Sequence, residues 1–150
     1  IFTEQFIEHL SFKEGKYFTR EAHRVLKPGG VIRQATPSLQ GLIDVYENQN
    51  EHVSQHAAIE RHVSNHEEIV SGDRAAHFLN DFFQLWGHKF IYDLETLWLL
   101  HSEAGFDSLE WKEFGCSSHE PLSGRERHAD LEWMEDAFCL ICEASKSEEI

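Results

Sequence analysis

Apolar residues recur at intervals of three and four positions over residues 15–26, a spacing that predicts one amphipathic helix. Ser11 and Glu14 stand at the spacing of a capping box, in which each side chain satisfies a backbone N–H at the start of the helix. Lys27-Pro28-Gly29-Gly30 ends it, because proline cannot continue a helix and glycine accepts the left-handed geometry that follows. The predicted apolar stripe consists of Gly15, Phe18, Ala22, Val25 and Leu26.

Three short runs further along have the character of strands. Residues 31–35, closed by Pro37, and residues 137–143 are apolar enough for interior strands, whereas residues 109–114 alternate with a period of two. The long connection between the last two strands favours an antiparallel return over a crossover helix. Helices between strands predict an α/β fold.

Three more helices are predicted from their spacing. Ser38 caps residues 39–46, residues 73–85 continue the helical pattern, and Asp93 caps a helix that Gly105 ends. In this last helix the inward side chains are expected to be Leu94, Leu97, Trp98 and Ala104.

Composition narrows the class of protein. A chain of 150 residues with 41% hydrophobic residues suits one folded domain, and no apolar run approaches the ~20 residues of a membrane span. With 13 basic and 27 acidic residues the net charge is −14, which repels phosphate backbones. We therefore expect no membrane segment and no nucleic-acid partner.

The three cysteines do not predict a disulfide framework. Cys139 and Cys142 lie three apart on a predicted strand, hence on opposite faces and about 10 Å apart, too far for a disulfide. We interpret them as core thiols, which together with Cys116 fit a reducing cytoplasm.

Several short sequence motifs are found together in this chain. In the first third these are Glu8-His9-Leu10, Arg24 to Val31 (RVLKPGGV) and Ala35-Thr36-Pro37. Later come Trp86-Gly87-His88, Tyr92-Asp93, Leu97 to Leu100 and Glu103-Ala104-Gly105-Phe106. In combination they resemble the C-terminal half of a class I S-adenosylmethionine-dependent methyltransferase, over most of residues 1–114.

The resemblance implies a partial Rossmann-like sheet made of the last strands of that fold. Residues 1–3 resemble the tail of the fourth strand, and the family's seventh strand is antiparallel and lies between the fifth and sixth. The family's glycine-rich cofactor loop and the acidic residue ending its second strand have no counterpart here. We expect residues 1–146 to be the C-terminal part of such a domain, with a polar, lid-like insertion at 47–72 and a polar tail at 147–150.

By the same resemblance, Thr3, Glu4, Gln5 and Phe6 would lie beside the methionine and adenosyl portions of S-adenosylmethionine. His9 follows as a candidate general base, although it equally suits a helix cap or a hydrogen bond to a strand carbonyl. Gln5 stands where the family often has a histidine, which weakens proton abstraction at that position. Thr36 and His88 are candidate substrate contacts, and pairing with a nearby carboxylate is the alternative for His88.

Histidines in the polar segment raise the question of a metal. His52 and His56, and likewise His62 and His66, are four apart with Glu60 and Glu67 nearby, so a helix would project each pair from one face. This spacing recurs by chance in any histidine-rich helix and no thiolate supports it. We therefore assign no metal site from the sequence.

Two functions remain open. The first is methyl transfer to a small-molecule or saccharide-type acceptor, by a chain expected to be inactive alone and to bind no cofactor tightly. The second is a non-catalytic, homodimeric interaction module, since a half-sheet exposes an edge and apolar faces that another copy can cover.

Overall fold

The computed structural model describes residues 1–47, 74–127 and 138–148, which form an α/β fold. Within these residues one four-stranded mixed sheet has the order β1-β2-β4-β3. Its first two strands, β1 (Phe2–Glu4) and β2 (Val31–Pro37), are parallel. The fourth, β4 (Cys139–Ser145), runs antiparallel to both β2 and β3 (Ser108–Trp111). The expected antiparallel return, and the place of the last strand between the two before it, are confirmed.

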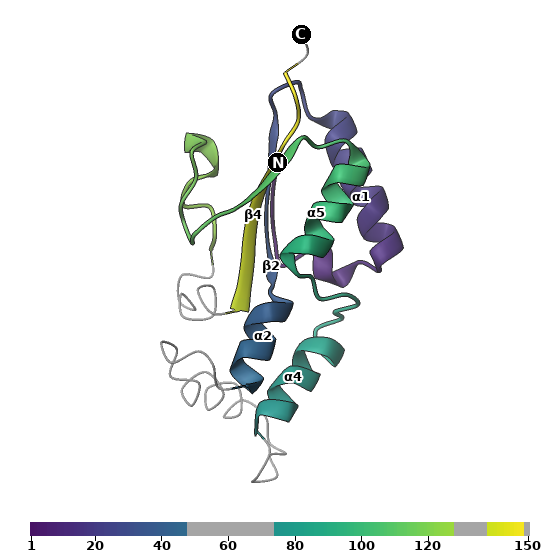
Figure 1. Cartoon of the computed structure of the whole chain (residues 1–150), viewed down its shortest axis with the longest axis vertical. Helices are drawn as coiled ribbons and strands as arrows, with labels where there is room; N and C mark the ends of the chain where they lie inside the picture. Colours follow the sequence, from purple (N-terminus) through teal and green to yellow (C-terminus); the bar gives the residue numbers. More distant parts are fainter. Residues whose placement is uncertain (48–73, 128–137, 149–150) are drawn as a thin grey trace.

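Helices cover one face of the sheet and one end of it. Helices α1 (Phe12–Val25) and α5 (Leu94–Ala104) lie side by side on the same face, and α2 (Leu39–Tyr46) and α4 (Arg74–Gln84) lie beyond the carboxyl end of β2 (Figure 1). A short 3-10 helix, η1 (Ile7–His9), connects β1 to α1, and a second, η2 (Glu120–Leu122), lies between β3 and β4. None of the helices in the described ranges has both the length and the apolarity that crossing a bilayer requires.

The start of α1 forms as predicted, but its buried face differs. The Ser11 hydroxyl accepts the N–H of Glu14, and the Glu14 carboxylate accepts the N–H of Ser11 at 2.8 Å, which completes the capping box. Gly15, Thr19 and Ala22 are the buried residues. The inward placement of Val25 was wrong: it is 58% exposed, because at this end of α1 it is Ala22 and Leu26 that pack into the core.

In α5 the predicted ends are right and part of the inward face is wrong. The Asp93 carboxylate accepts the N–H of Thr96, and Gly105 ends the helix at a φ of 101°, in the left-handed region. Leu97, Leu100 and His101 are buried. Leu94 and Trp98, which were expected inside, are 42% and 40% exposed, so the buried face of α5 is centred on the other three residues.

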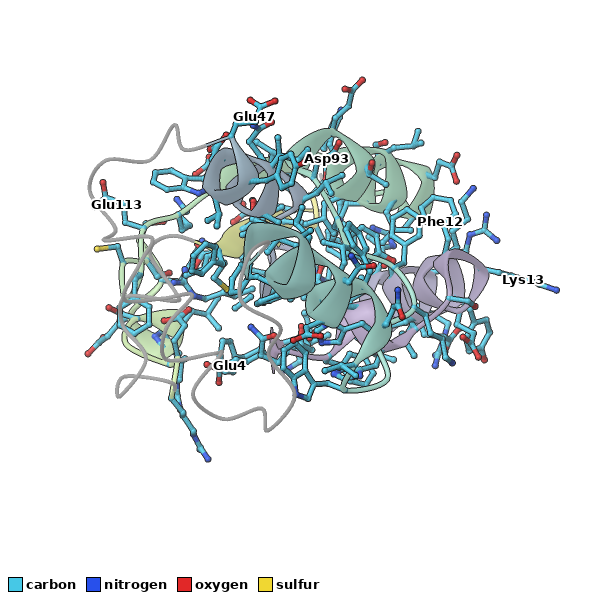
Figure 2. All side chains as sticks on the ribbon, turned by 90° about the horizontal axis from the view of Figure 1, so that it is seen from below. Glu4, Phe12, Lys13, Glu47, Asp93 and Glu113 are labelled. Carbon is cyan, nitrogen blue, oxygen red and sulfur yellow. The ribbon has the colours of Figure 1, made fainter. Side chains whose placement is uncertain are left out.

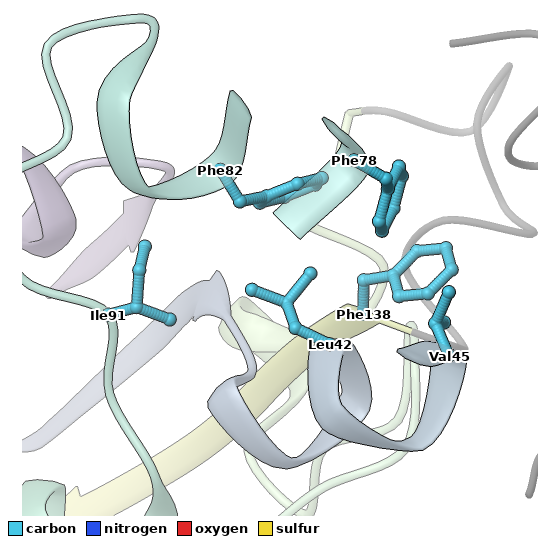
Figure 3. Packing of buried hydrophobic residues seen from close by; sticks show 6 residues of the cluster. All are labelled: Leu42, Val45, Phe78, Phe82, Ile91 and Phe138. Carbon is cyan, nitrogen blue, oxygen red and sulfur yellow. The ribbon is translucent and has the colours of Figure 1, made fainter. Parts of the chain in front are cut away.

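The core has two parts. Apolar side chains of the sheet, including Leu140, Cys142 and Ala144 of β4, pack beneath α1 and α5. A separate cluster joins α2 to α4 at the carboxyl end of β2 (Figure 3). Its buried members are Leu42, Val45, Phe78, Phe82, Ile91 and Phe138.

A buried cluster of charged side chains lies on the opposite face of the sheet. The guanidinium of Arg33 on β2 donates to Glu126 at 2.6 Å and to Glu143 of β4 at 2.8 Å, and all three side chains are at most 3% exposed. It also donates to the carbonyls of Cys116 and Glu113. β3 ends at Trp111 and not at Phe114 as predicted, and beyond it the carbonyls of Glu113 and Cys116 accept hydrogen bonds from Arg33.

The cysteines are free, as expected. Cys142 is buried, Cys139 is half-buried and Cys116 is exposed, so only Cys142 matches a core thiol fully. Most of the predicted polar insertion at 47–72, including the four histidines at 52, 56, 62 and 66, lies outside the described residues.

Replacement of Arg33 by methionine should lower the free energy of unfolding by about 3–5 kcal/mol, because the buried Glu126 carboxylate would lose its cation and Glu143 would keep only the more distant Lys112 Nζ, at 4.0 Å. Arg24→Met is the matched control. Its pair with Glu21 is exposed to solvent, so its loss should lower the free energy of unfolding much less than the loss of Arg33. Urea unfolding of both variants checks the difference, and equal losses would contradict the structural role of the buried cluster.

Candidate functional site

The carboxyl ends of β1 and β2 meet at one edge of the sheet. Because the two strands are parallel, the residues that follow them, Gln5 to Leu10 and Ser38, come together there. In open α/β sheets ligands bind at this edge. Figure 2 views the molecule from this end and labels Glu4, the last residue of β1.

Glu8 is the buried centre of this edge. Its side chain is fully buried, and its Oε2 accepts the Thr36 hydroxyl proton of β2 at 2.8 Å. Its Oε1 has no hydrogen-bond donor among the described residues. Burial raises the pKa of Glu8 above its usual value, and the hydrogen bond from Thr36 opposes this shift.

The backbone of Glu8 brings a distant segment to the site. Its carbonyl accepts the N–H of Lys89 at 2.7 Å and the N–H of Phe90 at 3.2 Å. Just before them the chain reverses through Trp86 and Gly87, which have positive φ angles of 55° and 82°. This turn places His88 against His9, with ring centroids 5.0 Å apart.

The two histidines differ in their partners. His9 Nε2 lies 3.6 Å from Glu8 Oε1, and its side chain is 37% exposed. His88 Nδ1 lies 2.7 Å from the carbonyl oxygen of Phe82. A carbonyl only accepts, so this nitrogen carries the proton and the neutral ring keeps its lone pair on Nε2. The N-cap residue of α1 is Ser11, so His9 does not have the helix-capping role that was considered for it.

Tyr92 is fully buried, and the charge of Glu8 acts on it. Burial, and then the charge of Glu8, raise the pKa of Tyr92 to about 12, so its phenol stays protonated at neutral pH. The helix α1 comes close to it at Gly15, where a Cβ atom would lie 2.7 Å from the Tyr92 hydroxyl. A larger residue at this position would force the buried Tyr92 side chain to shift.

The four predicted cofactor residues lie at the edge but have different neighbours. Glu4 accepts the N–H of Arg127 at 2.9 Å. Gln5 adopts a positive φ of 48°, and its N–H is donated to Ala35. Phe6 packs edge-on against Phe18 of α1, and Thr3 is half-buried within β1. Contact of these residues with S-adenosylmethionine stays a prediction.

The structure brings His9, His88 and Thr36 together around Glu8. Thr36 is fully buried beneath Glu8, and its contact with substrate stays a prediction. From the sequence, Glu8 contributes only to the motif Glu8-His9-Leu10, and no role is predicted for its carboxylate. Its available signal was a carboxylate between Ile7 and Leu10, in the first turn after the strand at the start of the sequence.

Comparison with models of known protein families and with curated proteins finds no match for this chain. The geometry at the carboxyl edge therefore carries the functional interpretation.

Replacement of Glu8 by glutamine should change how stability depends on pH. With a raised pKa, the folded protein keeps the Glu8 proton above pH 4.5, where the unfolded chain has lost it. The wild type should therefore lose stability relative to Glu8→Gln as pH rises from 4.5 to the folded pKa, at up to about 1.4 kcal/mol per pH unit. Urea unfolding of both proteins across this range measures it. A difference that stays constant from pH 4.5 upward would show that the pKa of Glu8 is not raised in the folded protein.

Proposed function

We propose that this chain is the C-terminal part of an S-adenosylmethionine-dependent methyltransferase domain that acts on a small-molecule or saccharide-type acceptor. The observation that supports it most is the strand order, with antiparallel β4 between β2 and β3 and a parallel β1-β2 pair beside them. This is the arrangement expected of the last strands in the family that the sequence resembles.

The carboxyl edge supplies groups that suit methyl transfer. The reaction needs an acceptor atom aligned with the methyl carbon and, for a hydroxyl or amine acceptor, a group that takes its proton. His9 is open to solvent on one side and lies 3.6 Å from the Glu8 carboxylate. In this role His9 Nε2 accepts the proton, and the charge of Glu8 stabilises the imidazolium formed.

The proposed contacts with S-adenosylmethionine are made by residues Thr3 to Phe6. Thr3 and Glu4 end β1, and Gln5 and Phe6 follow it, at the edge where a nucleoside would lie; Gln5, in the left-handed region, turns the chain there. Adenosine recognition in the family also uses the glycine-rich loop and the acidic residue that this sequence lacks. The chain by itself is therefore proposed to bind no cofactor tightly.

The setting proposed for this activity is a reducing cytoplasm, which the three free cysteines support. The charge of −14 disfavours nucleic-acid acceptors and leaves small molecules as the proposed substrate class.

A second candidate is a homodimeric interaction module. β3 is an edge strand of the described sheet, and its last residue, Trp111, is 56% exposed. Leu94 and Trp98 of α5 are 42% and 40% exposed. A solvent-open groove of about 600 Å³ lies here, lined by Leu94, Trp98 and Leu109 among others. An edge strand, open on one side and next to exposed aromatic side chains, is a surface that a second copy can cover.

Calorimetric titration with S-adenosylhomocysteine tests the methyltransferase proposal. The isolated 150 residues should give no measurable heat of binding. The product of the complete reading frame that contains them should bind with a micromolar dissociation constant, because it would supply the glycine-rich loop.

Two outcomes would contradict this proposal. Micromolar affinity of the isolated chain would show that the loop is not required. No binding by the complete product at 100 µM ligand would remove the methyltransferase assignment, and a dimer in light scattering would then favour the interaction module.

A further inference from the structure

Glu8, His9 and His88 together have the composition of a metal-binding site. One carboxylate oxygen of Glu8 and one nitrogen of each imidazole all lie within 4.8 Å of one another. Two histidines and one glutamate are a common ligand set for Zn²⁺ with one position left open. Ligand atoms around a tetrahedral zinc ion are about 3.3 Å apart, given bonds of about 2.0 Å. The 3.6 Å between Glu8 Oε1 and His9 Nε2 is close to this value.

The buried oxygen of Glu8 points independently to a missing cation. Glu8 is fully buried, and its Oε1 has no hydrogen-bond donor in the described part of the chain. A buried carboxylate oxygen that accepts no hydrogen bond carries a desolvation penalty. A metal ion bound to Oε1 would offset it, while Oε2 keeps the hydrogen bond from Thr36.

His88 is already oriented as a metal ligand. Histidines that bind metals usually donate their other ring N–H to a carbonyl or carboxylate, which fixes the tautomer and the ring orientation. Here Nδ1–H is donated to the Phe82 carbonyl at 2.7 Å. The lone pair is then on Nε2, as coordination requires.

The backbone holds the three ligands before any ion binds. Glu8 and His9 are adjacent in η1, and the Glu8 carbonyl accepts the N–H groups of Lys89 and Phe90. The ligand segments are therefore joined by main-chain bonds and not only by side-chain contact. Because His9 is 37% exposed, the fourth position of the ion is open to water.

We propose that Glu8 Oε1, His9 Nε2 and His88 Nε2 bind one Zn²⁺ ion, with water as the fourth ligand. This site does not depend on the proposed methyltransferase activity. The two do compete for one atom, since His9 Nε2 cannot accept a proton while it is bound to zinc.

Competition with a chromophoric zinc chelator tests the site on the whole chain, with Zn²⁺ as the only ligand. The parent protein should carry glutamine at positions 52, 56, 62 and 66, so that the histidine pairs of that segment do not contribute. We expect one zinc ion per chain with a dissociation constant below 1 µM. His88→Gln and His9→Gln should each weaken binding at least 100-fold.

His119→Gln is the matched control, because His119 is exposed and lies outside the cluster. It should leave zinc affinity unchanged. Far-ultraviolet circular dichroism checks that each variant is folded, and His9, being partly exposed, provides a variant that should fold normally. X-ray absorption of the zinc-loaded parent should show two imidazole ligands per ion.

The proposal is overturned if the parent binds zinc more weakly than 10 µM. It is also overturned if the His9, His88 and His119 variants bind equally well, or if the absorption spectrum shows fewer than two imidazoles.

Discussion

The hydrogen bonds from Lys89 and Phe90 to the carbonyl of Glu8 are the constraint on which the site depends. They join the turn after β1 to a segment about eighty residues later, which no local propensity would bring there. The carboxylate of the same residue accepts a hydrogen bond from the hydroxyl of Thr36, near the end of β2. One residue thus connects three parts of the chain by its backbone and its side chain. The two histidines face each other as a consequence.

The sheet is held from both faces, by different physical means. Under α1 and α5 the contact is apolar and depends on side chains such as Leu97 and Leu140. On the other face Arg33 joins two buried carboxylates and two carbonyls, so geometry is specified by hydrogen bonds. Strands fixed in this way give η1 a rigid base. A site built on it needs little reorganisation to bind a ligand.

Local signals in the sequence predict local structure well. The capping box at Ser11 and the left-handed stop at Gly105 depend on residues within one or two turns, and both are confirmed. Periodicity alone did not show that Trp98 is exposed, because that depends on where α1 lies. The contact between His9 and His88 was beyond the sequence for the same reason. His9 and His88 could each be named as candidates, but the bonds that join them to Glu8 come from tertiary structure.

The most direct test of this account is an NMR measurement of the distance between the imidazole rings of His9 and His88 in the whole chain. With ring centroids 5.0 Å apart, cross-relaxation between their carbon-bound protons should be observed. The amide protons of Lys89 and Phe90 should also be protected from exchange by their bonds to Glu8. Assigned rings with no cross-relaxation, together with unprotected amides, would show that the two segments do not meet and that the site does not exist.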